Sequence, residues 1–102
     1  MDTISPLNRS KVLEVLRTIK PELEREYHVA EIGLFGSFAR GEEQKTSDVD
    51  ILVEFSRPVG MFKFLELEEY LESKIGKKVD LVSRKALKPY IGRRILNEVI
   101  VV

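Results

Sequence analysis

The stretch GLFGSFARGEEQKTSDVDILVEF, residues 33–55, decides the fold because it contains two apolar runs separated by a polar loop. Gly36-Ser37 interrupts the first run where a strand is expected to end. Asp48 and Asp50 stand at the mouth of the second run, DVDILVEF, which is otherwise typical of a buried strand. Carboxylates are seldom buried without a partner, so their position indicates a site at this end of the strand.

Four segments are expected to form strands, because each combines apolar residues with a nearby turn signal. Between the first two, SFAR (37–40) can start a short helix that Gly41 stops, and GEEQKTS (41–47) is a polar loop. The expected strands are AEIGLF (30–35), DVDILVEF (48–55), KKVDLVS (77–83) and, as an edge strand, EVIVV (98–102).

Helices are expected before and between these strands. The first starts at Ser5-Pro6, where Ser can cap and Pro suits the first helical position, and Pro21 is expected to bend or split it after Ile19. A last helical stretch is expected with Ser83 as its cap, although Pro89 leaves open which residue begins the helix. The apolar positions expected to line the two long helices are Val12, Leu16, Ile19, Leu23 and Tyr27 in the first, then Phe62, Leu65, Leu67, Leu71 and Ile75 in the second, with Gly76 as the stop.

This order predicts an α/β (α+β) fold, a mixed β-sheet with helices packed mainly on one face. The chain has 102 residues, so residues 1–102 are expected to form a single domain. His28 follows the first helix and is expected to be a local cap rather than a catalytic base. Phe62, Phe64, Leu65 and Leu67 are expected in the core, while Val59-Gly60-Met61-Phe62 leaves an apolar edge for a base or a partner.

Composition restricts the possible partners. Lys plus Arg and Asp plus Glu both number 17, so the formal net charge is zero and nucleic acid is not expected as the main partner. There is no cysteine and one histidine, which makes a zinc site improbable. No apolar run approaches the length of a membrane span. We therefore expect a cytoplasmic protein without membrane contact.

Asp48 and Asp50 are predicted to share one face of their strand, since residues two apart point the same way. Val49, Ile51 and Val53 then fill the opposite face. Asp80 alternates with Val79 and Leu81 and can join the pair if the two strands are neighbours.

Three carboxylates on adjacent strands can hold two divalent ions, and hard oxygen ligands favour magnesium or manganese. The alternatives are that Asp48 and Asp50 cap the loop or pair with Lys45 or Arg40, and that Asp80 is a surface residue beside Lys77 and Lys78.

The turn before the loop is suited to an anion. Gly36 lets a ligand approach the backbone because it has no Cβ. The N–H groups that follow it can face a phosphate, and the Ser37 hydroxyl adds a donor. Arg40, one helical turn further, either contacts phosphate or pairs with a nearby acid. Alone, a Gly-Ser turn is an ordinary turn with a helix cap.

Together these residues resemble a known family. Residues 36–41 read G-S-x-A-R-G, residues 47–50 read S-D-x-D, and Asp80 lies on a later strand. This composite is similar to the nucleotidyltransferase superfamily of DNA polymerase β, and more closely to the minimal nucleotidyltransferase (MNT) family. The resemblance implies a polymerase β-like fold. It implies that Asp48, Asp50 and Asp80 are catalytic metal ligands and that Gly36, Ser37, Arg40 and Ser47 bind nucleotide.

The resemblance also implies a function. MNT proteins are typically antitoxins encoded beside a HEPN-domain ribonuclease toxin, and members of this kind transfer AMP from ATP to a tyrosine of that toxin. A Mg²⁺-dependent protein adenylyltransferase using two ions, with Mn²⁺ as a possible substitute, is therefore expected, assembled with its toxin. Two alternatives stay open: an antitoxin that neutralises by binding alone, and a nucleotidyltransferase acting on a small molecule.

Overall fold

The computed structural model describes residues 7–102, so the expected helix start at Ser5-Pro6 lies outside the described residues. Within that range helices and strands alternate in the predicted order. The elements are α1 (Arg9–Tyr27), β1 (Val29–Phe35), α2 (Gly36–Arg40), β2 (Val49–Phe55), α3 (Met61–Ile75), β3 (Val79–Ser83), the 3₁₀ turn η1 (Arg84–Ala86), α4 (Pro89–Glu98) and β4 (Ile100–Val101).

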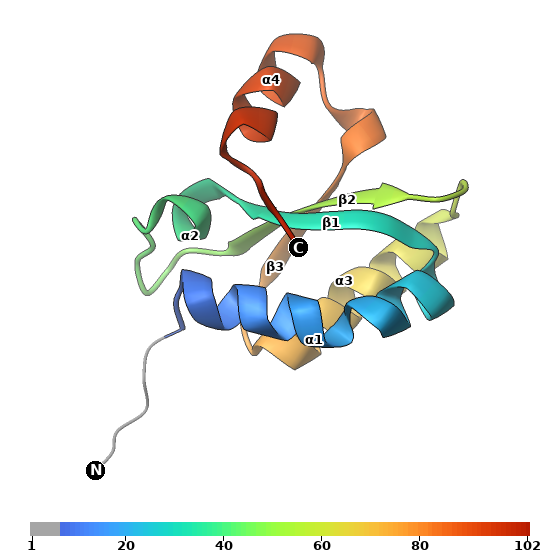
Figure 1. The fold of residues 1–102 in the computed structure, drawn as a ribbon, viewed down its shortest axis with the longest axis horizontal. Coiled ribbons are helices and arrows are strands. Elements are labelled where there is room, and N and C mark those ends of the chain that lie inside the picture. The colour runs from blue at the N-terminus through green and yellow to red at the C-terminus, as the bar shows by residue number, and fades with distance from the viewer. Residues whose placement is uncertain (1–6) are drawn as a thin grey trace.

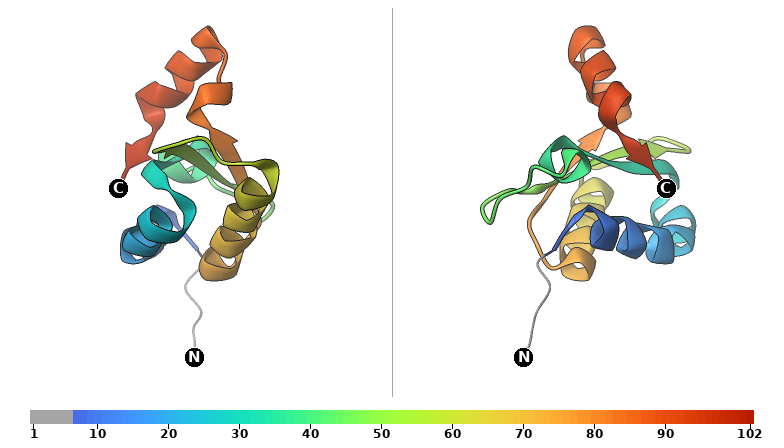
Figure 2. Two further views of the ribbon diagram at one scale, coloured as in Figure 1. Left: turned by 90° about the vertical axis from the view of Figure 1, so that its right-hand side faces the viewer. Right: turned by 60° about the vertical axis from the view of Figure 1, so that its left-hand side comes forward.

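The strands form one mixed sheet in the order β3-β2-β1-β4. β2 pairs antiparallel with β1 and parallel with β3, and β4 pairs antiparallel with β1 at the edge. Helices α1 and α3 lie side by side beneath the sheet, whereas α4 stands on its other side (Figure 1, Figure 2). The predicted mixed sheet with helices mainly on one face is confirmed.

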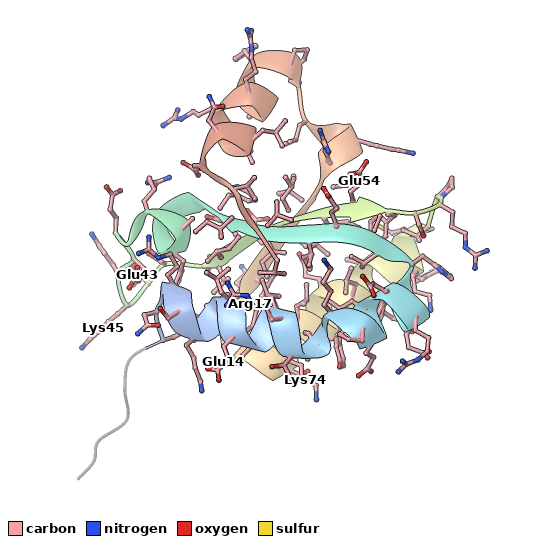
Figure 3. All side chains as sticks on the ribbon, viewed as in Figure 1. Glu14, Arg17, Glu43, Lys45, Glu54 and Lys74 are labelled. Carbon is pink, nitrogen blue, oxygen red and sulfur yellow. The ribbon has the colours of Figure 1, made fainter. Side chains whose placement is uncertain are left out.

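The core lies between the sheet and the helices α1 and α3. On β2 the side chains of Val49, Ile51 and Val53 are fully buried toward these helices. This alternation places the even-numbered residues of β2 on the α4 side, where Figure 3 shows Glu54. The helices supply the matching apolar residues, which include Val12, Leu16, Leu23, Leu67 and Leu71.

The predicted split of the first helix is wrong, because α1 continues through Pro21. Proline removes the hydrogen bond to the carbonyl four residues earlier. Pro21 is exposed, so that carbonyl can be hydrated, while Ile19 and Leu23 on either side are buried in the core. Core burial on both sides therefore outweighs the local cost. At its ends Asn8 caps the helix by accepting from the Lys11 N–H at 2.9 Å, and His28 is the expected C-cap.

Two predictions for later helices are also wrong. Phe62 is 86% exposed and Leu65 is 44% exposed, so neither belongs to the core. The buried stripe of α3 is Leu67, Leu71 and Ile75, and Phe62 and Leu65 fall on its other side at 3.6 residues per turn. Ser83 does not cap the last helix.

That last helix, α4, begins at Pro89. Pro89 keeps Lys88 extended and is itself well suited to the first helical position. Within residues 7–102, no helix has the combination of length and apolar character needed to cross a membrane.

We predict that Pro21→Ala raises the free energy of unfolding by about 1–2 kcal/mol. The substitution restores a helix hydrogen bond, although it also increases the entropy of the unfolded chain. Urea denaturation followed by circular dichroism measures the difference. Pro89→Ala is the matched control, since proline at a first helical position costs little and its removal should not stabilise the protein. A destabilised Pro21→Ala protein would show that the proline is needed for the path of α1.

Candidate active site

Asp50 and Asp80 are direct neighbours across the parallel pair of β2 and β3. Strands in a sheet lie about 4.8 Å apart, and residues in register project from the same face. Both side chains therefore lie on the face opposite the buried Val49, Ile51 and Val53. The structure thus brings Asp80 beside Asp50, as the sequence predicted if the two strands were adjacent.

Asp48 lies one residue before β2, on the same side as Asp50. The N–H of Val49 donates to the carbonyl of Lys78 at 2.9 Å, which fixes the entry of β2 next to the start of β3. Asp48 and Asp80 are exposed, and Asp50 is half-buried between them. The three predicted metal ligands therefore lie at the start of two adjacent strands.

The electrostatics of Asp50 reflect this crowding. Burial, followed by the negative charges of Asp80 and Asp48, raises the pKa of the Asp50 carboxyl to about 6. The positive charge of Arg40 acts in the opposite direction but does not cancel the effect. Asp50 is thus held where its negative charge is unfavourable unless a cation is nearby.

The donor set fits a divalent cation by charge and by chemical type, because magnesium prefers carboxylate oxygens. Within residues 7–102, however, no three Asp, Glu, His or Cys side chains are gathered closely enough to form a ready-made metal site. Binding two ions would therefore require the carboxylates to draw together.

The Gly36-Ser37 turn lies directly against Asp50. Gly36 follows Phe35, which is the residue of β1 paired with Asp50. It has a φ of +78°, a conformation that side chains disfavour, and a Cβ at this position would overlap the Asp50 carboxylate oxygen Oδ2. Glycine is therefore required both for the turn and for the close approach of the turn to the carboxylate.

The remaining predicted nucleotide-binding residues make contacts within the protein. Arg40 donates to Glu42 at 2.9 Å and to Glu98 at 3.1 Å, so its guanidinium is paired with acids. The Ser47 hydroxyl accepts from the N–H of Gln44 at 2.9 Å and closes a turn in the loop before β2. Of the two roles expected for Arg40, phosphate contact or pairing with a nearby acid, the structure shows the pairing with acids.

Sequence reasoning missed Glu98, the last residue of α4. Its carboxylate accepts a hydrogen bond from the Gly36 N–H at 2.7 Å. The one usable signal, that a negative charge at the carboxyl end of a helix opposes the helix dipole, was hidden because residue 98 was expected in the strand 98–102. Such a residue indicates a partner elsewhere, although the sequence does not say which one.

An apolar cavity of about 430 Å³ lies at the other end of β2, away from the carboxylates. Its walls include Phe55, Pro58, Met61 and Phe64, which come from the end of β2 and the start of α3. Part of the apolar edge noted in the sequence, Val59-Gly60-Met61, lines it. This cavity is separate from the Asp50 site, since the two are at opposite ends of the strand.

Residues 16–102 match the family model described as the nucleotidyltransferase domain, and the chain belongs to this family. The chain is 46% identical over 96 residues to protein adenylyltransferase MntA of Thermococcus cleftensis, covering 94% of this chain and 97% of that protein. The expected membership in the minimal nucleotidyltransferases is confirmed, and the chain is a nucleotidyltransferase.

Solved structures agree with this assignment. A structure described as a minimal nucleotidyltransferase superposes with a TM-score of 0.82 at 29% identity, covering 95% of this chain and 98% of that one. A toxin–antitoxin structure with AMP-PNP superposes with a TM-score of 0.67 at 26% identity, covering 93% of this chain and 72% of that one. The polymerase β-like fold predicted from the sequence is consistent with both.

We predict that Asp50→Asn stabilises the metal-free protein at pH 7.5 by about 1 kcal/mol, after allowance for solvent screening of this half-buried group. A carboxyl with a raised folded-state pKa stabilises below its unfolded pKa of 3.8, and this stability is lost as the pH rises through about 6. The advantage of Asp50→Asn should therefore disappear below pH 4. Thermal unfolding in EDTA from pH 3.5 to 8 measures it, and a pH-independent difference would contradict the assigned cause.

We predict that Gly36→Ala destabilises the protein by about 2 kcal/mol or more, because a Cβ both strains the backbone and meets Asp50. The double variant Gly36→Ala/Asp50→Ala should recover part of this loss, since it removes the overlap but not the strain. Gly41→Ala is the control: it shares a positive φ of 73°, but its Cβ would meet nothing within 4 Å. Chemical denaturation of wild type and these three variants, with Asp50→Ala alone to subtract the effect of removing the Asp50 charge, separates strain from overlap.

Proposed function

We propose that this chain is a Mg²⁺-dependent protein adenylyltransferase that transfers AMP from ATP to a tyrosine of a HEPN-domain toxin and so acts as an antitoxin. The observation that carries the proposal is the register pairing of Asp50 with Asp80 next to the Gly36 turn. Nucleotidyl transfer requires carboxylates that hold metal ions and, next to them, a turn that can bind the phosphates of the nucleotide.

Each of the predicted site residues then has a specific role in the reaction. Asp48, Asp50 and Asp80 would hold two Mg²⁺ ions, or Mn²⁺ in their place, which neutralise phosphate charge and lower the pKa of the attacking hydroxyl. Gly36 and Ser37 would carry the outer phosphates of ATP, with Arg40 and Ser47 at the border of the nucleotide site. Catalysis by these groups is positioning together with charge stabilisation.

The reaction forms a bond between a tyrosine oxygen and the α-phosphorus of ATP and breaks the bond between the α- and β-phosphates. Pyrophosphate leaves, and the tyrosine proton passes to solvent. Asp80 belongs to the edge strand β3 and is exposed, so it borders the side from which an acceptor can approach.

The acceptor tyrosine is assigned to a partner rather than to this chain. Two of the three tyrosines of the chain, Tyr27 and Tyr70, pack against each other with ring centroids 5.5 Å apart on the helices α1 and α3, beneath the sheet and away from Asp50. Burial raises the pKa of Tyr27 and raises that of Tyr70 to about 12, so neither loses its proton readily. The third, Tyr90, is 70% exposed on α4, so the assignment to a partner rests on similar proteins. Two similar proteins support a protein acceptor: one is protein adenylyltransferase MntA of Thermococcus cleftensis, and the other is a toxin–antitoxin structure with AMP-PNP.

The decisive experiment uses this chain and the product of the neighbouring gene, which we expect to be a HEPN-domain protein, incubated with ATP and Mg²⁺. We expect intact-mass spectrometry to show a mass increase of one or more AMP units on the HEPN protein. Asp48→Asn/Asp50→Asn should abolish the increase, a loss of at least about 10³-fold in rate. EDTA should do the same.

Glu54→Gln is the matched control, since it lies on the same strand and face as Asp50 but pairs with Arg84 at 3.2 Å. It should keep nearly full activity. If the double Asn variant still modified the HEPN protein, the carboxylate assignment would be wrong. If no covalent increase appeared and the Asn variant still protected cells from the toxin, neutralisation by binding would replace the enzymatic proposal. Labelling of a small molecule in place of the protein would favour the remaining alternative.

A further inference from the structure

Glu98 precedes β4 and lies where the antiparallel pairing of β1 with β4 would continue if the strand were longer. The observed pairs are Leu34 with Ile100 and Gly33 with Val101. Continuing this antiparallel register by two residues brings Glu98 opposite Gly36. Because residue 98 is still in helix α4, it is the Glu98 side chain that accepts the Gly36 N–H, at 2.7 Å.

The same carboxylate also holds the other end of α2. The Arg40 Nη1 donates to Glu98 Oε1 at 3.1 Å and to Oε2 at 3.2 Å. Gly36 is the first residue of α2 and Arg40 the last, so one side chain is bonded to both ends of this short helix. Ser37 lies between these two contacts.

This contact is not a solvated surface pair. The Glu98 side chain is 24% exposed, compared with 67% for Glu42, the other carboxylate bonded to Arg40. Glu98 also lies at the unfavourable end of a helix dipole and adds negative charge near Asp50. Charge-assisted hydrogen bonds to a backbone N–H and to a guanidinium offset these two costs.

The direction of the Gly36 N–H determines which role is open to Glu98. The N–H of Gly36 is bonded to Glu98, whereas the side of Gly36 on which a Cβ would stand faces the Asp50 carboxylate. Glu98 therefore holds the turn through its backbone N–H and not through the side that faces Asp50, although its negative charge still acts on Asp50.

We propose that Glu98 is a positioning residue for nucleotidyl transfer, which holds the Gly36-Ser37 turn at its distance from Asp50 by clamping both ends of α2. The inference rests on the proposed function, since it assigns the turn to the phosphates of ATP. Displacing a bound group by about 1 Å can cost about 10²-fold in rate. Loss of the clamp therefore lowers turnover more than nucleotide affinity.

The test compares Glu98→Ala, Glu98→Gln and Glu42→Gln in the full chain. We expect Glu98→Ala to lower kcat for modification of the HEPN protein about 10–100-fold. The Kd for AMP-PNP with Mg²⁺, measured by calorimetry, should change less than about threefold. Glu98→Gln keeps an oxygen that can accept the Gly36 N–H, so it should restore much of kcat. Glu42→Gln neutralises the Arg40 partner that does not contact Gly36, and it should behave as wild type.

Three results would overturn the inference while leaving the proposed function standing. The first is wild-type kcat in Glu98→Ala. The second is tighter AMP-PNP binding with undiminished turnover, which would make Glu98 a competitor of phosphate. The third is a loss of kcat that follows the fraction unfolded and disappears at lower temperature, which would make its role structural only. If wild type itself transferred no AMP, both proposals would fail together.

Discussion

The site depends on the register that places Asp50 beside Asp80 on two parallel strands. Like charges directly opposite each other in a sheet are destabilising. The raised pKa of Asp50 is the consequence, caused by burial and by the two neighbouring carboxylates. The fully buried side chains of Val49, Ile51 and Val53 on the other face fix this register. A slip by one residue would turn the carboxylates into the core and the apolar residues out of it.

A second set of contacts joins this pair to the rest of the chain. Gly36 lies against Asp50 on one side and donates to Glu98 on the other, and Glu98 in turn holds Arg40. β1, β2, α2 and α4 therefore meet around one turn. The C-terminal segment belongs to the architecture of the site, since without it the Gly36 N–H would lose its acceptor and Arg40 would lose the more buried of its two carboxylate partners.

Most local structure followed from local signals, and the errors have physical explanations. Period-two alternation identified β2, and Gly41 and Gly76 end helices where expected. Pro21 was expected to interrupt α1, but core burial at Ile19 and Leu23 outweighs a lost hydrogen bond on the exposed side. Phe62 and Leu65 were expected on the same side of their helix as Leu67, Leu71 and Ile75 and in the core, but at 3.6 residues per turn they lie outside that buried stripe.

The sequence by itself determined that Asp48 and Asp50 share a face, because strand periodicity is a local property, and the composite motif determined the family. Only the tertiary structure decided that Asp80 lies beside Asp50, that Arg40 pairs with acids and that Glu98 reaches Gly36. These contacts join residues about 30 to 60 positions apart in the chain. They depend on strand order and register, which are set by how the whole core packs, and no local pattern encodes them.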